Sequence, residues 1–164
     1  MRNPVPVAFP LPTSSVNQDT RPADPHRGHT PVVLIVDDDV AVRDILAWVV
    51  QSAGYEAVAA AGADGYRRLT ELAERTALVL LDLTMHGMDG FRFRELQLAE
   101  ASLATVPTIV LSGGLVSAAD RDRLRASAYV QKPMRLSELR ATMLEQARRV
   151  PGTTPRPSAV AHTA

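Results

Sequence analysis

The stretch PVVLIVDDDV (residues 31–40) decides the fold, because an apolar run passes directly into three carboxylates. The run 32–36 contains only aliphatic residues, which is typical of a strand buried on both faces of a parallel sheet. Asp37, Asp38 and Asp39 follow without a break. Adjacent carboxylates repel one another, so this strand end is either a solvated turn with a helix cap or a site that holds a cation.

Composition excludes several classes of chemistry. The chain has 164 residues, of which 46% are hydrophobic and 4% aromatic, so one domain with an aliphatic core is expected. The formal net charge is zero, which gives no electrostatic indication of direct nucleic-acid binding. Cysteine is absent, which excludes disulfides, thiol catalysis and thiolate-held zinc. No stretch reaches the about 20 apolar residues of a membrane helix, so we expect no membrane insertion and a cytoplasmic location.

Proline placement marks the domain boundaries. Six of the 12 prolines fall in residues 1–30, and three fall in residues 151–164. Segments of this composition are typical of disorder, so both are predicted to be disordered extensions. Residues 31–150 are then predicted to form the one folded unit.

Inside the folded unit, apolar runs alternate with amphipathic stretches. Strands are predicted at 32–36, 55–61, 77–83, 106–114 and 128–131, and helices at 40–54, 64–75, 90–100, 117–126 and 136–150. In the first helix, Ile45 is expected on the buried face and Gly54 is placed to end the helix. Five successive β–α units favour an α/β fold with a parallel sheet, which binds ligands at the carboxyl ends of its strands.

Polar groups stand at four of these predicted strand ends. The acids Asp37 and Asp38 follow the first strand, and Asp82 ends the third. Ser112 and Lys132 stand at the ends of the fourth and fifth strands. Because parallel strands end side by side, these groups can converge although they are far apart in sequence. Asp39, by contrast, is expected only to cap the helix that follows.

Lysine occurs once in this chain. Of the 18 basic residues, 17 are arginine, and the exception is Lys132 beside Pro133. This usage predicts that arginine supplies the ordinary surface charges. It also indicates a site at Lys132 that needs a compact ammonium group rather than a planar guanidinium.

Four motifs together resemble the receiver domain of two-component response regulators. They are LIVDDDVAVR (34–43), LLDLTMHGMDG (80–90), IVLSG (109–113) and YVQKP (129–133). The resemblance covers the whole folded unit. It implies a flavodoxin-like (βα)5 fold with a five-stranded parallel sheet in the order 2-1-3-4-5.

The resemblance also implies a role for each matched residue. Asp82 would be the phospho-acceptor, and Lys132 would stabilise charge on the phosphoryl group. Asp37, Asp38, Asp82 and the backbone carbonyl of Thr84 would bind Mg²⁺. The chemistry agrees, because a hard divalent cation held by oxygens would neutralise acids that otherwise repel an incoming phosphoryl group.

Two further positions would form the switch. Ser112 would donate a hydrogen bond to the phosphoryl group, and Tyr129 matches the aromatic switch position. His86 stands where the family usually has proline, and we expect it to be a solvated loop residue without a metal or phosphate role. The stretch 112–132 is shorter than usual for the family, around the fourth helix, where receivers engage partners.

The implied function is a phosphorylation-dependent signalling switch in a two-component or phosphorelay system, with a stand-alone receiver. A sensor histidine kinase or a histidine phosphotransfer protein would phosphorylate Asp82 and thereby alter the surface that binds an output partner. Such a protein catalyses only its own aspartyl phosphorylation and dephosphorylation, so it is not a conventional enzyme. The sequence does not indicate which output partner it binds.

Three alternatives are open to the same sequence. A non-phosphorylated pseudo-receiver could act as a scaffold on this fold, but a pseudo-receiver typically lacks one residue of the set that is complete here. A phosphatase that uses Asp82 as nucleophile would need a second acid two residues later, where Thr84 stands. Flavin binding is the least favoured, because the loop after the first strand is acidic where a phosphate must bind.

Overall fold

The structure is a computed structural model, and it describes residues 29–150. Five strands form one sheet: β1 (Val32–Val36), β2 (Glu56–Ala60), β3 (Thr76–Asp82), β4 (Thr108–Ser112) and β5 (Ala128–Gln131). Their order is β2-β1-β3-β4-β5 and every neighbouring pair is parallel, which confirms the predicted flavodoxin-like sheet. The two predicted extensions, apart from residues 29 and 30, lie outside the described part of the chain.

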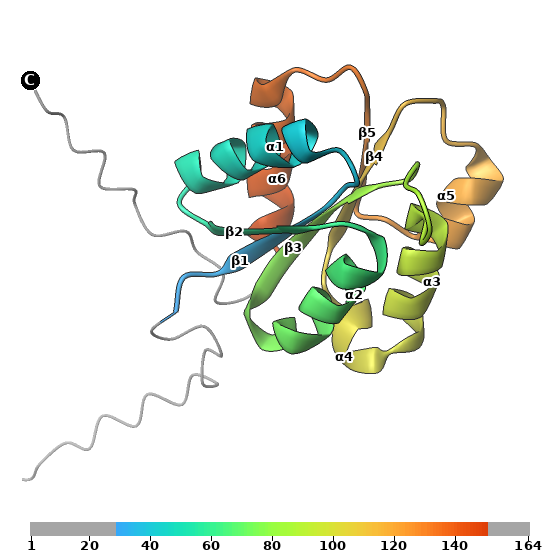
Figure 1. The fold of residues 1–164 in the computed structure, drawn as a ribbon, viewed down its shortest axis with the longest axis horizontal. Coiled ribbons are helices and arrows are strands. Elements are labelled where there is room, and N and C mark those ends of the chain that lie inside the picture. The colour runs from blue at the N-terminus through green and yellow to red at the C-terminus, as the bar shows by residue number, and fades with distance from the viewer. Residues whose placement is uncertain (1–28, 151–164) are drawn as a thin grey trace, which may run out of the picture.

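Helices cover both faces of this sheet (Figure 1). In the described residues they are α1 (Val40–Ser52), α2 (Gly62–Glu71), α3 (Gly90–Ala99), α4 (Ala101–Ala104), α5 (Ala118–Leu124) and α6 (Leu136–Ala147). α1 and α6 pack on one face, whereas α2, α3 and α4 pack on the other. Within residues 29–150 none of these helices has the length and apolar character needed to cross a membrane.

The three central strands are buried along their whole length. Every residue of β1, β3 and β4 is buried, which explains why these strands read as uninterrupted aliphatic runs. Successive residues of β1 point to opposite faces: Val33 and Ile35 join the cluster under α1 and α6, and Leu34 and Val36 join the cluster under α2 and α3. This alternation leaves the strand ends as the places where polar side chains gather.

α1 agrees with the predicted helix at both of its ends but not in the residues of its buried face. Asp39 accepts hydrogen bonds from the backbone N–H groups of Ala41 and Val42 at 2.8 and 3.3 Å, so the predicted helix cap is confirmed. Gly54 follows the helix with φ of 87°, a left-handed conformation that suits glycine. Ile45 was wrongly predicted to be buried: it is 50% exposed, because only a narrow stripe of α1 contacts the sheet.

The helical segments that follow β2 and α3 also differ from the prediction. The helix predicted at 64–75 ends at Glu71, and a 3₁₀ turn (Ala73–Arg75) follows it. The carbonyl of Leu72 accepts hydrogen bonds from both the N–H and the hydroxyl of Thr76, which directs the chain into β3. The short helix α4 was not predicted at all, since four residues are too few to show a helical period.

Gly90 begins α3 directly against β3. A Cβ atom there would overlap the backbone carbonyl oxygen of Asp82 and lie 2.7 Å from the Cα of Leu83. Since backbone atoms move aside only with the strand itself, we expect Gly90→Ala to lower the free energy of unfolding by about 1–3 kcal/mol. Urea denaturation measures this loss. The matched control is Gly113→Ala, where a Cβ atom would have no heavy atom within 4 Å outside its two chain neighbours. Equal losses of unfolding free energy in both variants would contradict the expectation.

Candidate functional site

Three carboxylates meet at the carboxyl ends of β1 and β3. Asp37 and Asp38 directly follow β1, and Asp82 is the last residue of β3. One oxygen of each side chain lies within 4.8 Å of an oxygen of the other two. Asp37 and Asp82 are buried, whereas the Asp38 side chain is 26% exposed. The structure therefore brings together the three acids that the sequence predicts as one site.

Lys132 follows β5 and directs its ammonium group into this carboxylate cluster. Its Nζ atom lies 2.8 Å from Asp37 Oδ2 and 3.0 Å from Asp82 Oδ1. Burial raises the pKa of Asp82, and the hydrogen bond and charge of Lys132 oppose that rise. Burial also disfavours the charged form of Lys132, but its hydrogen bonds to Asp37 and Asp82 leave its pKa raised. The only lysine of the chain thus offsets part of the repulsion among the acids.

Asp37 is held in one orientation by contacts on both of its carboxylate oxygens. The backbone N–H of Asp39 donates to Asp37 Oδ1 at 2.9 Å, while Lys132 donates to Oδ2. The guanidinium of Arg43, in the first turn of α1, donates to the Asp37 carbonyl at 2.7 Å. Arg43 was not predicted as a site residue. Its position in the first helical turn after the acidic stretch could have indicated that its side chain lies near Asp37.

The loop after β3 contributes His86 and Thr84. The backbone N–H of His86 donates to Asp38 Oδ2 at 3.0 Å, and its ring Nδ1 lies 2.6 Å from the same oxygen. These contacts lower the pKa of Asp38, with the side-chain hydrogen bond as the largest cause. His86 is exposed as predicted, but its contact with Asp38 was not anticipated. Thr84 is exposed two residues after Asp82, and the role of its carbonyl stays a prediction.

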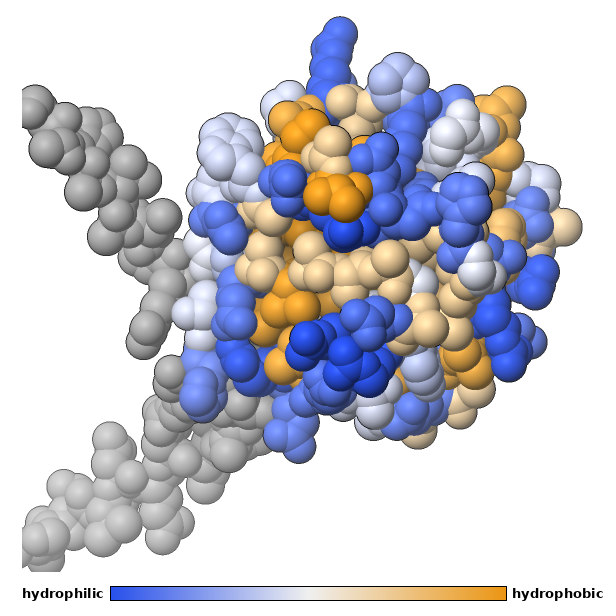
Figure 2. All heavy atoms as spheres, viewed as in Figure 1, coloured by the Kyte–Doolittle hydropathy of each residue, from blue (hydrophilic) through white to orange (hydrophobic). Residues whose placement is uncertain are grey.

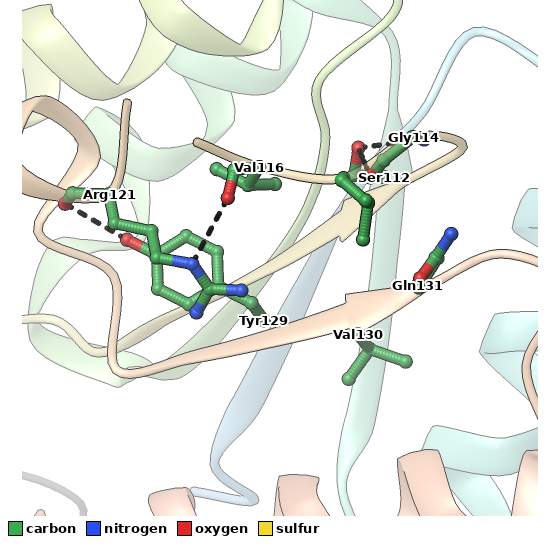
Figure 3. A pocket seen from close by; sticks show the side chains of 8 residues that line it. Ser112, Gly114, Val116, Arg121, Tyr129, Val130 and Gln131 are labelled. Carbon is green, nitrogen blue, oxygen red and sulfur yellow. Dashed lines mark hydrogen bonds between the residues drawn. The ribbon is translucent and has the colours of Figure 1, made fainter. Parts of the chain in front are cut away.

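The two predicted switch residues line a hollow of about 210 Å³ beside this cluster (Figure 3). The Ser112 hydroxyl donates to the Gly114 carbonyl at 2.9 Å and accepts from the Gly114 N–H at 3.2 Å. The Tyr129 hydroxyl donates to the Arg121 carbonyl at 3.1 Å and accepts from the Ala126 N–H at 3.2 Å. Figure 3 shows the Arg121 guanidinium over the Tyr129 ring, 4.3 Å from its centroid. Both hydroxyls are therefore bonded to nearby backbone rather than to the acids.

A buried polar network lies next to these residues, between α3, β4 and the end of α5. The Arg94 guanidinium donates to the carbonyls of Leu124 and Arg125 at 2.8 and 2.9 Å and to the Thr108 hydroxyl at 3.1 Å. Thr108 in turn donates to the Gln97 side chain at 3.0 Å. Burial lowers the pKa of Arg94 to about 10. The two carbonyls and the hydroxyl that accept hydrogen bonds from its guanidinium carry no charge. Arg94 thus fastens α5 to α3.

This network shows that arginine also has a buried role, which its expected use for ordinary surface charges did not include. Arg94 is only 4% exposed, and Gln97 is completely buried. The buried side of α3 consists of Gly90, Phe93, Arg94 and Gln97, which have the spacing of one helical stripe. The spacing could have indicated the burial of Arg94 and Gln97 from the sequence, because it places both polar residues on the helix face that carries Phe93.

The sheet order and the carboxylate cluster together define a receiver-like α/β domain. The sequence model of the response regulator receiver domain matches residues 33–144. The chain belongs to this family, which places it in two-component signalling. The predicted resemblance is thereby confirmed.

Curated relatives share this domain within longer proteins. The "Probable transcriptional regulator ycf27" of Cyanophora paradoxa is 36% identical, over 74% of this chain and 50% of that protein. The "Protein-glutamate methylesterase/protein-glutamine glutaminase 6" of Anaeromyxobacter dehalogenans is 36% identical, over 73% of this chain and 35% of that protein. This chain therefore spans half or less of the length of these two relatives.

A solved structure covers the same domain. The crystal structure of a response regulator receiver protein from Pseudomonas putida is 30% identical, with a TM-score of 0.62. It covers 74% of this chain and 98% of its own. The similarity therefore extends over a complete receiver and leaves the flanking residues of this chain unmatched.

Proposed function

We propose that the protein is a phosphorylation-dependent switch of a two-component or phosphorelay system, with Asp82 as the phospho-acceptor. The donor would be a phosphohistidine on a sensor histidine kinase or on a histidine phosphotransfer protein. The strongest support is the contact between Asp82 and Lys132 inside a cluster of three carboxylates. Burying a carboxylate beside two others is costly, and a site that receives a charged phosphoryl group with a cation explains that cost.

The three carboxylates fit a hard divalent cation, and we propose Mg²⁺. Asp37, Asp38 and Asp82 each direct one oxygen to the same place, and carboxylate oxygens are ligands that Mg²⁺ prefers. The backbone carbonyl of Thr84 would supply a further oxygen. The bound ion would neutralise the acids and bind phosphoryl oxygens.

Asp82 and Lys132 would carry the transfer itself. A carboxylate oxygen of Asp82 would attack phosphorus, the phosphorus–nitrogen bond of the donor would break, and the histidine would leave as an imidazole. The product is an acyl phosphate on Asp82. The Lys132 ammonium, already 3.0 Å from Asp82 Oδ1, would hydrogen-bond the phosphoryl oxygens and stabilise their charge. Hydrolysis of the acyl phosphate by water would reset the switch.

Ser112 and Tyr129 would transmit the phosphorylation to the surface. The Ser112 hydroxyl would exchange its local bonds to Gly114 for a hydrogen bond to the phosphoryl group. The hollow between Ser112 and Tyr129 would give the ring space to move inward. This movement would change the surface of β5 and α5 and so shift its affinity for an output partner.

Phosphorylation of Asp82 is the direct test. The full chain is incubated with Mg²⁺ and acetyl phosphate, and its intact mass is measured. We expect one added phosphoryl group on the wild type and none on Asp82→Asn, because an amide cannot form the acyl phosphate. The control is Asp39→Asn, an exposed helix cap beside the cluster, which should be phosphorylated like the wild type.

The other outcomes identify the alternatives. A wild type that binds Mg²⁺ and stays unmodified would contradict the switch and favour a scaffold. Continuous release of inorganic phosphate at high turnover would instead indicate a phosphatase.

A further inference from the structure

An apolar groove runs along the surface between α1 and the amino-terminal end of α6. It consists of two adjoining hollows of about 330 and 340 Å³ that share Leu136. The lining of the first includes Ile45, Pro133 and Met134, and the second contains Trp48. The groove therefore extends from the stem of the site lysine to the middle of α1.

Three large apolar side chains of this groove are exposed to solvent rather than buried in the hydrophobic core. Trp48 is 66% exposed, Ile45 is 50% exposed and Leu136 is 38% exposed. Ile45 and Trp48 are three residues apart, so they form a second apolar stripe on α1 beside the buried one. Figure 2 shows hydrophobic side chains exposed over α1 at the top of the view. A contiguous exposed patch of this kind marks a binding surface.

The same chain contains a segment whose chemistry matches this groove. Residues 4–12 read PVPVAFPLP, in which four prolines alternate with apolar residues that include Phe9 and Leu11. Proline fixes φ and lacks an N–H group, so such a segment favours an extended polyproline conformation rather than a helix or a central strand. Proline-rich segments of this type bind in grooves lined by aromatic side chains. Trp48 supplies that aromatic side chain.

The intervening chain is long enough for this contact. Residues 13–28 separate the segment from the first described residue, and 16 extended residues span up to about 50 Å. A folded unit of this size is only about 35 Å across. A segment tethered in this way is present at a millimolar effective concentration, which favours it over a second copy of the chain in dilute solution.

We propose that residues 4–12 bind in the groove between α1 and α6 of the same molecule and cover one face of the Trp48 ring. This contact goes beyond the phosphorylation switch and does not depend on it. It assigns a binding function to residues 4–12.

Trp48 is the only tryptophan of the chain, so its fluorescence reports on the groove alone. The full-length wild type is compared with the full-length double variant Phe9→Ser/Leu11→Ser. Removing the contact should shift the emission to longer wavelength and increase quenching by acrylamide about twofold, because one of the two ring faces becomes accessible. A peptide of residues 1–16, added to the variant, should restore the protection. The matched control is Val16→Ser, in the same extension but outside the segment, which should behave like the wild type.

Two results would overturn the proposal. Identical quenching of the wild type and the double variant would show that the segment does not cover Trp48. Protection that disappears when the protein is diluted would show that a second copy covers the groove instead. Since neither measurement uses a phosphodonor, both outcomes are independent of whether Asp82 is phosphorylated.

Discussion

Lys132→Arg should be phosphorylated on Asp82 about a hundredfold more slowly than the wild type, the loss typical of removing one group that stabilises transition-state charge. The Lys132 ammonium fits between Asp37 Oδ2 and Asp82 Oδ1, at 2.8 and 3.0 Å. A guanidinium is larger and planar, and it cannot place one nitrogen between these oxygens without displacing a carboxylate. The charge is kept while the geometry is lost. The initial rate of mass increase with acetyl phosphate and Mg²⁺ measures the effect.

The control exchanges arginine for lysine at an exposed position close to Lys132. Arg135→Lys, three residues later, changes a side chain that is 83% exposed and pairs with Glu138 at 3.7 Å. Exposed ion pairs contribute little, so its phosphorylation rate should equal that of the wild type. If Lys132→Arg also reacts at the wild-type rate, the ammonium has no special role and the meaning given to the single lysine is wrong.

Arg94→Ala should lower the free energy of unfolding by about 2–4 kcal/mol, because the change leaves a cavity and removes the donors to two helix-end carbonyls. The loss of a buried charge offsets part of this cost, which is why the expected value lies below the sum of the two terms. Arg94→Met fills most of the volume without the charge and should therefore lose less. Urea denaturation measures the free energy of unfolding of both variants. Relative to the wild type, Arg94→Ala should increase the rate of amide hydrogen exchange more in α5 than in β1.

A residue two positions earlier in α3 provides the comparison. Arg92 is 57% exposed and pairs with Glu95 on the same helix. Arg92→Ala should change the free energy of unfolding by less than about 0.5 kcal/mol. An equal loss in both alanine variants would mean that the buried network does not stabilise the fold.

Much of the architecture could be predicted from the sequence because burial on two faces leaves a simple pattern. β1, β3 and β4 are fully buried, and their aliphatic runs were visible at once. Asp82 was predicted because a polar residue that ends such a run must lie at a strand end, and Lys132 was predicted because it is the only lysine and stands in the YVQKP motif. The sheet order came from the resemblance to receiver domains, since alternating strands and helices alone allow several orders.

What could not be predicted depends on where side chains point. Tyr129 was expected only to occupy the aromatic switch position, and the sequence could not show that its hydroxyl bonds to the backbone of Arg121 and Ala126. Ile45 belongs to an apolar pattern that is wider than the stripe contacting the sheet. The burial of Arg94 was not predicted, because residue type alone cannot show that helix-end carbonyls satisfy a buried guanidinium.

The way α5 is held bears on how easily the partner-binding surface proposed there could change its side chains. Arg94 and Tyr129 hold this helix through backbone carbonyls and one backbone N–H, which nearly every amino acid supplies alike. Exposed positions such as Asp122 can therefore change without loosening the helix from the sheet. Evolution or an engineer could exchange one set of outward side chains for another and obtain a new partner on an unchanged scaffold.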